Sequence, residues 1–210
     1  MPPSAGAPIP EAQTTPWNHN IHYYPLVLRS VPEGAARALD VGCGEGLLSR
    51  QLRTLVPDVL GIDRHQASID RAREKANGES AYLAGDFMDH PFEPASFDFI
   101  TSVASLHHMD VAAALHRMRT LLRPGGGLVV IGLARSSRPA DWAADLLGHI
   151  ADRLHKVTKN EVEDGAPKVW PPPQTYSQTR KLSRHALPGA QYRRHLLWRY
   201  SIVWTAPSNQ

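Results

Sequence analysis

The sequence predicts an α/β fold with a seven-stranded, mostly parallel sheet and helices on both of its faces. Short apolar runs alternate along the chain with segments whose apolar residues recur at helical spacing. Gly, Pro, Asn and Asp residues mark the turns between these segments. Strands that alternate with helices form parallel sheets, because right-handed crossovers return the chain to the same end of the sheet. A chain of 210 residues is long enough for one such domain with a sizeable core.

The first part of the chain contains five expected strands and three expected helices. Residues 38–41 form a short apolar run between a Pro-Glu-Gly turn and Gly42, as is typical of a buried parallel strand. The other four strands are expected at residues 59–62, 82–84, 97–102 and 128–133. Amphipathic helices are expected at residues 47–56, 67–76 and 111–122, each followed by a Pro, Asn-Gly or Pro-Gly-Gly signal that ends it.

The last third of the chain departs from this alternation. Residues 141–157 have apolar side chains on one side of a predicted helix, and residues 161–175 contain three consecutive prolines that predict a loop. Residues 135–176 are therefore expected to form an insertion before the last strands. A helix at residues 177–186 and two strands or a bent hairpin at residues 192–204 complete the predicted fold.

Composition limits the class of protein. A hydrophobic fraction of 42% suits a globular chain, and no run approaches the roughly 18 apolar residues that span a bilayer. Residues 1–16 have neither a basic start nor an apolar stretch, so we expect a disordered tail before a single domain at residues 17–210. Cys43 is the only cysteine, which excludes an intrachain disulfide and a cysteine-based metal cluster and favours a reducing cytoplasm.

A glycine loop follows the first strand and indicates a ligand. Gly42, Gly44 and Gly46 follow Asp40, whereas Leu47 occupies the third glycine position of a dinucleotide loop. Such a loop lets a ligand approach the backbone, and the helix that follows favours negative charge. An acid just before the loop suits a ligand with a cationic end better than a pyrophosphate. S-adenosylmethionine, which carries an ammonium, a sulfonium and a carboxylate, fits this pattern, and a tight turn without a ligand is the alternative.

Further polar residues end the neighbouring strands. Asp63 ends the second strand, where an acid reaches a ribose diol in such folds, although a lone Asp there also caps the next helix. Asp86 ends the third strand and has the oxygen atoms to accept from an adenine amino group, with a plain turn residue as the alternative. Ser102 ends the fourth strand. These positions converge because open α/β sheets bind ligands outside the carboxyl ends of their strands.

The ordered motifs resemble those of class I S-adenosylmethionine-dependent methyltransferases. They are Ala38-Leu-Asp-Val-Gly-Cys-Gly-Glu-Gly46, Gly61-Ile-Asp63, Gly85-Asp86, Phe97-Asp-Phe-Ile100, Leu106-His-His108 and Leu122-Arg-Pro-Gly-Gly126. The nearest subgroup is similar to small-molecule enzymes of the methyltransferase-11 and ubiquinone/menaquinone type. The resemblance covers about residues 37–133 and implies a Rossmann-like methyltransferase fold with S-adenosylmethionine as the methyl donor. It carries little information about the methyl acceptor.

The resemblance also implies roles for single residues in binding the cofactor. It assigns Asp40, Gly42, Cys43 and Gly44 to the methionine end, Asp63 and Arg64 to the ribose and adenine edge, Asp86 and Phe87 to adenine, and Ser102, Val103 and Ala104 to the floor. We expect His108 to contact the cofactor as well. In such enzymes a segment like residues 17–24 often closes over the cofactor, so Tyr24 is expected to touch it, with a simple hydrophobic cap as the alternative.

Departures from related families narrow the reaction. No Asn-Pro-Pro-Tyr or Asp-Pro-Pro-Tyr follows the fourth strand, which argues against the usual adenine-N6 and glutamine methylation. The only thiol, Cys43, lies in the glycine loop, so the cysteine nucleophile of cytosine-C5 enzymes is missing. No arrangement of acids predicts a metal-bound catechol site, and we expect no metal.

A general base is needed only when the acceptor holds its proton at neutral pH. Methyl transfer is an in-line displacement at an activated carbon, so much of the catalysis comes from alignment. Histidine suits the role of base because its ordinary pKa lies near 6.5. We therefore take His107 and His19 as catalytic candidates, with His108 and His22 as further candidates. The acceptor pocket is expected between residues 17–24 and the 135–176 insertion, which would act as a lid.

Three functions remain open. The first is a cytoplasmic methyltransferase that acts on a small molecule, for example a secondary metabolite, as a monomer or homodimer. For this function we expect no membrane partner and do not expect a nucleic-acid partner. The second is an RNA or protein methyltransferase that docks through its basic C-terminal region, since no acid follows Asp164. The third is a regulator that binds S-adenosylmethionine without turnover.

We predict that His107→Ala lowers the rate of methyl transfer far more than the affinity for S-adenosylmethionine. The physical reason is that a general base acts on the proton of the acceptor and not on the methyl donor. Steady-state turnover and a separate binding titration measure the two effects. Equal turnover in the variant and the parent would remove His107 from the mechanism.

Overall fold

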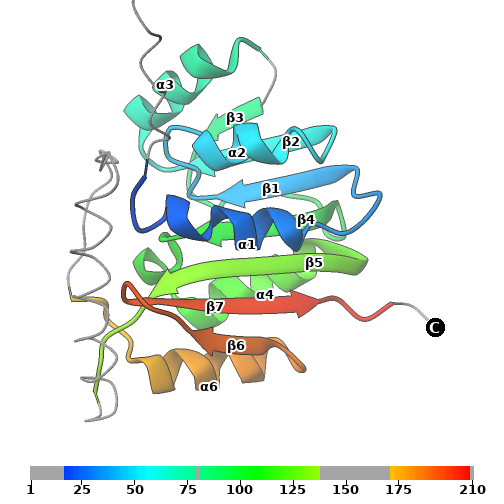
Figure 1. Ribbon diagram of the computed structural model, residues 1–210. Helices are drawn as coiled ribbons and strands as arrows, with labels where there is room; N and C mark the ends of the chain where they lie inside the picture. Colours follow the sequence, from blue (N-terminus) through cyan, green and yellow to red (C-terminus); the bar gives the residue numbers. More distant parts are fainter. Residues whose placement is uncertain (1–16, 79–80, 138–170, 209–210) are drawn as a thin grey trace, which may run out of the picture.

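The computed structural model describes residues 17–78, 81–137 and 171–208, which build a seven-stranded sheet flanked by helices (Figure 1). The strand order is β3-β2-β1-β4-β5-β7-β6. Their bounds are β1 Arg37–Val41, β2 Asp58–Asp63, β3 Ala81–Ala84, β4 Phe97–Val103, β5 Leu122–Leu133, β6 Gln191–Arg194 and β7 Arg199–Thr205. Strands β1 to β5 are parallel, and β7 pairs antiparallel with both β5 and β6. The predicted α/β fold with a mostly parallel seven-stranded sheet is therefore confirmed.

Helices cover both faces of this sheet. Their bounds are η1 Ile21–Tyr23, α1 Tyr24–Arg29, α2 Leu47–Leu52, α3 Gln66–Ala76, η2 Leu106–His108, α4 Val111–Leu121 and α6 Tyr176–Ala186. Helices α1 and α2 lie on one face, and α4 and α6 pack together on the other (Figure 1). A capping box at Thr175, whose side chain accepts from the Gln178 amide, explains why α6 begins where it does.

The central strands are apolar on both sides because both faces of the sheet are buried. In β5, Leu128 and Val130 belong to the core under α4 and α6, whereas Val129 and Ile131 belong to the core under α1 and α2. Successive strand residues point to opposite faces, so a continuous apolar run serves two cores. Because helices cover both faces of the sheet, a ligand site is expected at the ends of the strands.

Two predicted boundaries were wrong. Helix α2 ends at Leu52 and not at Val56, because the chain turns there and leaves Leu55 about half exposed. Strand β5 begins at Leu122 and not at residue 128, because Leu122 pairs with Phe97 before a register shift in the ladder. The Pro-Gly-Gly sequence that predicted a separate turn is therefore the irregular start of the strand.

The ends of the predicted 135–176 insertion lie side by side. Arg135 forms an isolated parallel bridge with Thr175, and its amide donates to the Gln174 carbonyl at 2.8 Å. The expected tail at residues 1–16, the expected helix at residues 141–157 and most of the expected loop at residues 161–175 lie outside the described residues. No helix within residues 17–78, 81–137 and 171–208 has the length and apolar character needed to span a bilayer.

We predict that Gly132→Ala lowers the free energy of unfolding by about 1–3 kcal/mol. A Cβ atom at Gly132 would lie 2.2 Å from Cζ of Tyr200, whose side chain is fully buried in the neighbouring strand. Urea unfolding followed by circular dichroism measures the loss. In a Tyr200→Leu background the same substitution should cost less, since the two residues share one space. An equal loss in both backgrounds contradicts this explanation.

Candidate functional site

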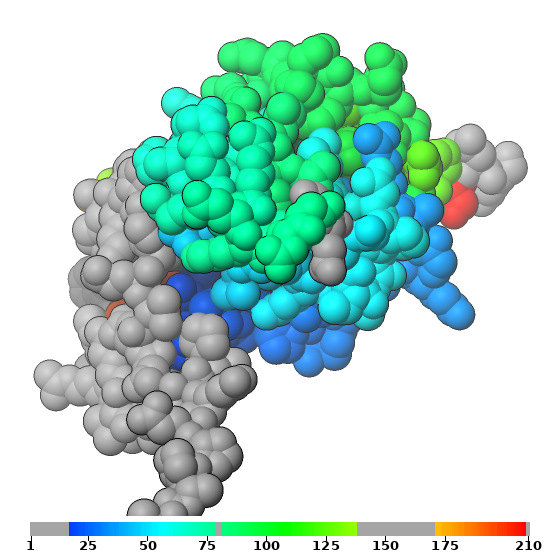
Figure 2. Space-filling model, turned by 90° about the horizontal axis from the view of Figure 1, so that it is seen from above, coloured from blue at the N-terminus to red at the C-terminus, as the bar shows by residue number. Residues whose placement is uncertain are grey.

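A cavity of about 700 Å³ opens at the carboxyl ends of β1 to β4. This is the point where the strand order reverses, because β2 and β3 lie on one side of β1 and β4 lies on the other. Open α/β sheets bind ligands at such points. Residues 18–24, which we call the N-terminal wall, contribute Asn18, Asn20, Ile21 and Tyr24 to the cavity lining. Figure 2, a view from the β3 edge, shows dark blue residues of this part of the chain beside the cyan residues that follow.

The glycine loop between β1 and α2 is held by its neighbours in the sheet. The amides of Gly42 and Cys43 both donate to the carbonyl of Ile62, and the Gly44 amide donates to Oδ2 of Asp63 at 2.9 Å. A Cβ atom at Gly42 would lie 2.3 Å from Cβ of Ser105, so this glycine is required by packing. A Cβ atom at Gly44 would meet nothing within 4 Å, so this position instead leaves room above the loop.

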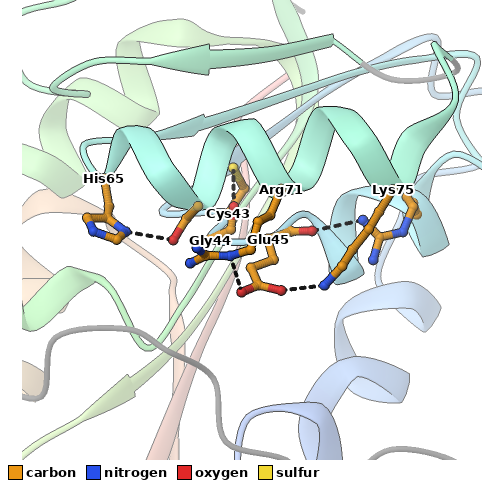
Figure 3. A network of polar contacts seen from close by, with 8 residues as sticks. Cys43, Gly44, Glu45, His65, Arg71 and Lys75 are labelled. Carbon is orange, nitrogen blue, oxygen red and sulfur yellow. Dashed lines mark hydrogen bonds and ion pairs between the residues drawn. The ribbon is translucent and has the colours of Figure 1, made fainter.

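An ion-pair network ties the same loop to α3 (Figure 3). The Glu45 carboxylate accepts from Nε of Arg71 at 2.7 Å and from Nζ of Lys75, and these bonds lower its pKa. Nη1 of Arg50 donates to the Glu45 carbonyl at 2.8 Å. This network was not predicted from the sequence, although Arg71 and Lys75 stand four residues apart and so share one face of α3.

Asp40 is the buried acid of the site. Only 2% of the residue is exposed, and its Oδ2 accepts from Oγ of Ser49 at 2.7 Å. Burial raises the pKa of Asp40 to about 7, and the nearby charge of Asp63 adds to this effect, whereas the Ser49 hydrogen bond opposes it. A carboxyl group poised near neutral pH at the edge of a cavity is typical of a functional position.

Asp63 and Asp86 accept hydrogen bonds from backbone amides of nearby turns, and their oxygen atoms can still accept from a ligand. Oδ1 of Asp63 accepts from the His65 amide and Oδ2 from the Gly44 amide, so this carboxylate fixes both the turn after β2 and the glycine loop. Oδ1 of Asp86 accepts from the Met88 amide, and Oδ2 lies 3.6 Å from Nε of Arg64. Each carboxylate oxygen can accept a second hydrogen bond. Structural roles in the turns and ligand binding are therefore compatible in both residues.

The structure brings nearly all the predicted cofactor-binding residues to the cavity. Those that line it are Tyr24, Asp40, Gly42, Cys43, Gly44, Asp63, Arg64, Asp86, Phe87, Val103, Ala104 and His108. Ser102 is fully buried and does not line it. Its Oγ lies 2.5 Å from Oγ of Ser105, which lines the cavity and donates to the Val41 carbonyl at 2.7 Å. The polar position at this strand end is thus Ser105, three residues later than sequence analysis suggested.

The two predicted catalytic histidines do not line the cavity. His107 is buried behind His108, with ring centroids 4.1 Å apart, and burial, His108 and Arg199 lower its pKa to about 4. His19 makes edge contacts with the rings of Trp17 and Trp198. His108 does line the cavity, and burial is the main cause that lowers its pKa. Its position favours His108 over His107 for contact with a ligand.

Sequence analysis missed several other lining residues. Besides Glu45, Lys75 and Ser105, they include Arg50, His65, Ser68 and Met109, whereas Asn18 and Asn20 belong to the 17–24 segment that was expected at the acceptor pocket. His65 and Ser68 follow β2, and their side chains lie 2.8 Å apart between Nδ1 and Oγ (Figure 3). Their nearness to Asp63 in the chain was a usable signal. The sequence signal for the N-terminal wall was weaker, because no local pattern indicates which of its residues face the cavity.

Comparisons with known proteins agree with this geometry. The family model of a methyltransferase domain matches residues 39–130. The uncharacterized methyltransferase Mb0092 of Mycobacterium bovis is 40% identical over 195 residues, which cover 91% of this chain and 98% of that protein. Phthiotriol/phenolphthiotriol dimycocerosates methyltransferase 1 of Mycobacterium ulcerans is 32% identical over 156 residues, which cover 72% of this chain and 56% of that protein.

A solved structure supports the fold independently. The PH0226 protein from Pyrococcus horikoshii aligns with a TM-score of 0.62 and 19% identity, over 89% of this chain and 88% of its own. Fold, motifs and relatives together establish the family, and the chain belongs to the class I S-adenosylmethionine-dependent methyltransferases.

We predict that Asp40→Asn removes a pH-dependent loss of stability. Because the pKa of Asp40 rises from 3.8 to about 7 on folding, the folded state binds the proton more tightly than the unfolded chain. The stability of the parent therefore falls as pH rises from about 4 to 7 and then levels off, by an amount on the order of a few kcal/mol. Asp40→Asn should lack this fall in urea unfolding between pH 5 and pH 8.

The control for this experiment is Asp89→Asn, at an exposed position. The control should follow the parent across the pH range. If Asp40→Asn also follows the parent, the buried carboxyl group does not carry the effect.

Proposed function

We propose that this chain binds S-adenosylmethionine in the cavity and transfers its methyl group to a small-molecule acceptor. The observation that carries the proposal is the gathering of Asp40, Asp63 and Asp86 around one cavity at the ends of β1, β2 and β3. A volume of about 700 Å³ lies within the range of about 300–1,000 Å³ that is usual for small-molecule sites.

The residues present fit this cofactor. Gly44 leaves open space beside the glycine loop, so the backbone there is accessible to a ligand. Asp40 would hold the cationic methionine end, Asp63 the ribose, and Asp86 with Phe87 the adenine. Phe87 is almost fully buried and lines the cavity, so its contact would be mainly with the backbone or one edge of the ring. Carboxylates suit hydroxyl and ammonium donors because they offer only acceptor atoms.

The chain contributes charge and alignment to the reaction. When bound, S-adenosylmethionine supplies a methyl carbon that its sulfonium has already activated. An ionised Asp40 stabilises positive charge at the methionine end, and its near-neutral pKa makes this contribution grow as pH rises through about 7. The clamped glycine loop and the N-terminal wall orient what is bound, which converts a bimolecular encounter into an aligned one.

Among the predicted base candidates, His108 is the one that lines the cavity, and we assign to it the role of taking a proton from the acceptor. Because burial and Arg64 lower its pKa, the imidazole is neutral near pH 7 and has a nitrogen that can accept. This assignment replaces His107 as the proposed base, so the loss of turnover that the sequence predicted for His107→Ala is now expected of His108→Ala. Acceptors that lose their proton without help would not need it.

Two observations support a small acceptor. The Mycobacterium ulcerans relative is named a phthiotriol/phenolphthiotriol dimycocerosates methyltransferase, and that name includes neither a protein nor a nucleic acid as acceptor. The basic C-terminal region suggested an RNA-binding face, but not all of its cationic side chains lie on an open surface. Arg199 is buried, and Arg194 lies 4.1 Å from the ring centroid of Tyr176.

We predict that the chain converts S-adenosylmethionine to S-adenosylhomocysteine in the presence of a member of a metabolite library. The control is Gly85→Leu, at a cavity position where a Cβ atom meets nothing within 4 Å, so that the added side chain should extend into the cavity. The control should lose binding of S-adenosylhomocysteine with a melting temperature near that of the parent. Binding by the parent without product from any acceptor would favour the non-catalytic regulator.

A further inference from the structure

The N-terminal wall is attached to the last two strands of the sheet, far away in the sequence. Oη of Tyr23 donates to the Leu196 carbonyl at 2.6 Å, and the Tyr23 ring contacts that of His195. The rings of His19 and Trp198 meet edge to face at 5.8 Å. All these partners belong to residues 195–198, which we call the β6–β7 turn. The wall of the cavity is therefore built against this turn.

Arg199 makes the most extensive of these contacts. Only 7% of the residue is exposed, and Nη2 and Nε of its guanidinium donate to Oδ1 of Asn20 at 2.8 and 3.3 Å. Nη1 donates to the Leu197 carbonyl at 3.1 Å. Asn20 lines the cavity, so a single buried cation joins the cavity wall to the backbone of the β6–β7 turn.

The β6–β7 turn has a backbone that needs such support. Leu197 and Trp198 both have left-handed backbone angles, with φ of 57° and 56°, a conformation that side chains with a Cβ rarely adopt. Leu197 is buried, and its carbonyl oxygen accepts the hydrogen bond from Arg199. Strained residues persist where surrounding contacts hold them, and such residues cluster near functional sites.

Residues of the N-terminal wall are hydrogen-bonded to one another, so a contact that fixes Asn20 also restrains its neighbours. Oδ1 of Asn18 accepts from the amides of both Asn20 and Ile21, at 2.9 and 2.8 Å. The Tyr23 amide donates to the Asn20 carbonyl at 3.0 Å. Asn18, Asn20 and Ile21 all line the cavity. Displacement of Asn20 would therefore change one whole side of the site.

We propose that Arg199 is a positioning residue for the cofactor cavity, which acts through Asn20 to hold the N-terminal wall in its binding-competent position. The inference rests on the proposed binding of S-adenosylmethionine to this cavity. Arg199 suits the task because guanidinium is always charged and donates in a fixed fork, so it holds the carboxamide oxygen in one orientation. Without this hold, the wall is in position for only part of the time, and the apparent dissociation constant rises by the inverse of that fraction.

The first experiment measures binding of S-adenosylhomocysteine by calorimetry to the parent, Arg199→Met and Arg199→Lys. We expect the dissociation constant to rise about tenfold in Arg199→Met, and Arg199→Lys to fall between the two because ammonium lacks the fork. Arg193→Met, at an exposed position of β6, is the matched control and should bind as the parent does. Equal binding by parent, Arg199→Met and Arg199→Lys would overturn the proposal.

A second measurement separates positioning from general stability. Hydrogen exchange of residues 18–24 should become at least about tenfold faster in Arg199→Met without ligand, while the amides of β1 and β5 keep their parental rates. Uniform acceleration across the chain would mean that Arg199 only stabilises the fold. Because this readout needs no ligand, it tests the hold on the wall even if the parent fails to bind S-adenosylhomocysteine, a result that would count against the proposed function alone.

A double-mutant cycle tests whether Arg199 acts through Asn20. In an Asn20→Ala background, Arg199→Met should change the dissociation constant of S-adenosylhomocysteine by less than about twofold, since the partner that transmits the effect is already gone. An undiminished tenfold effect in that background would show another route and overturn the proposed one.

Discussion

The close packing of the glycine loop against Ser105 and Tyr82 is the constraint on which the site depends. A Cβ atom at Gly42 would collide with Ser105, and one at Gly46 would lie 2.4 Å from Oη of Tyr82. These contacts join the end of β1 to the end of β4 and to β3, so the cavity exists only when three strands are in register. The Glu45 network then ties the loop to α3, which leaves Gly44 as the position that is open to a ligand.

A second consequence of this packing is that the site contains an acid at a cost in stability. Asp40 is buried beneath the loop, and one hydroxyl group, that of Ser49, compensates for only part of its lost hydration. An apolar side chain at this position would not carry this desolvation cost. An acid at this position suits a ligand with a cationic end, because a nearby cation would compensate for the hydration that the carboxylate loses on burial.

The fold was largely predictable because its signals are local. Apolar runs and turn residues located the five parallel strands. The start of β5 and the end of α2 were wrong, and the turn between β6 and β7 was left undefined, because these details are decided by neighbours distant in the chain. The candidate site was predictable where residues follow a strand directly, as with Asp40, Asp63 and Asp86. The place of Ser105 in the site was not predictable, because the turn after β4 includes Ala104 in a left-handed conformation with φ of 55°, and no sequence motif indicates this turn.

The sequence by itself determined the fold class, the cofactor loop and the family, because each depends on residue types at short, regular spacing. Only the tertiary structure decided which histidine reaches the cavity and what the C-terminal arginines do. His107 and His108 are neighbours in the chain, yet one is buried behind the other. Arg199 looked like part of a basic surface, but it is buried against Asn20, 179 residues away. Such contacts arise from packing between distant segments, and no local pattern encodes them.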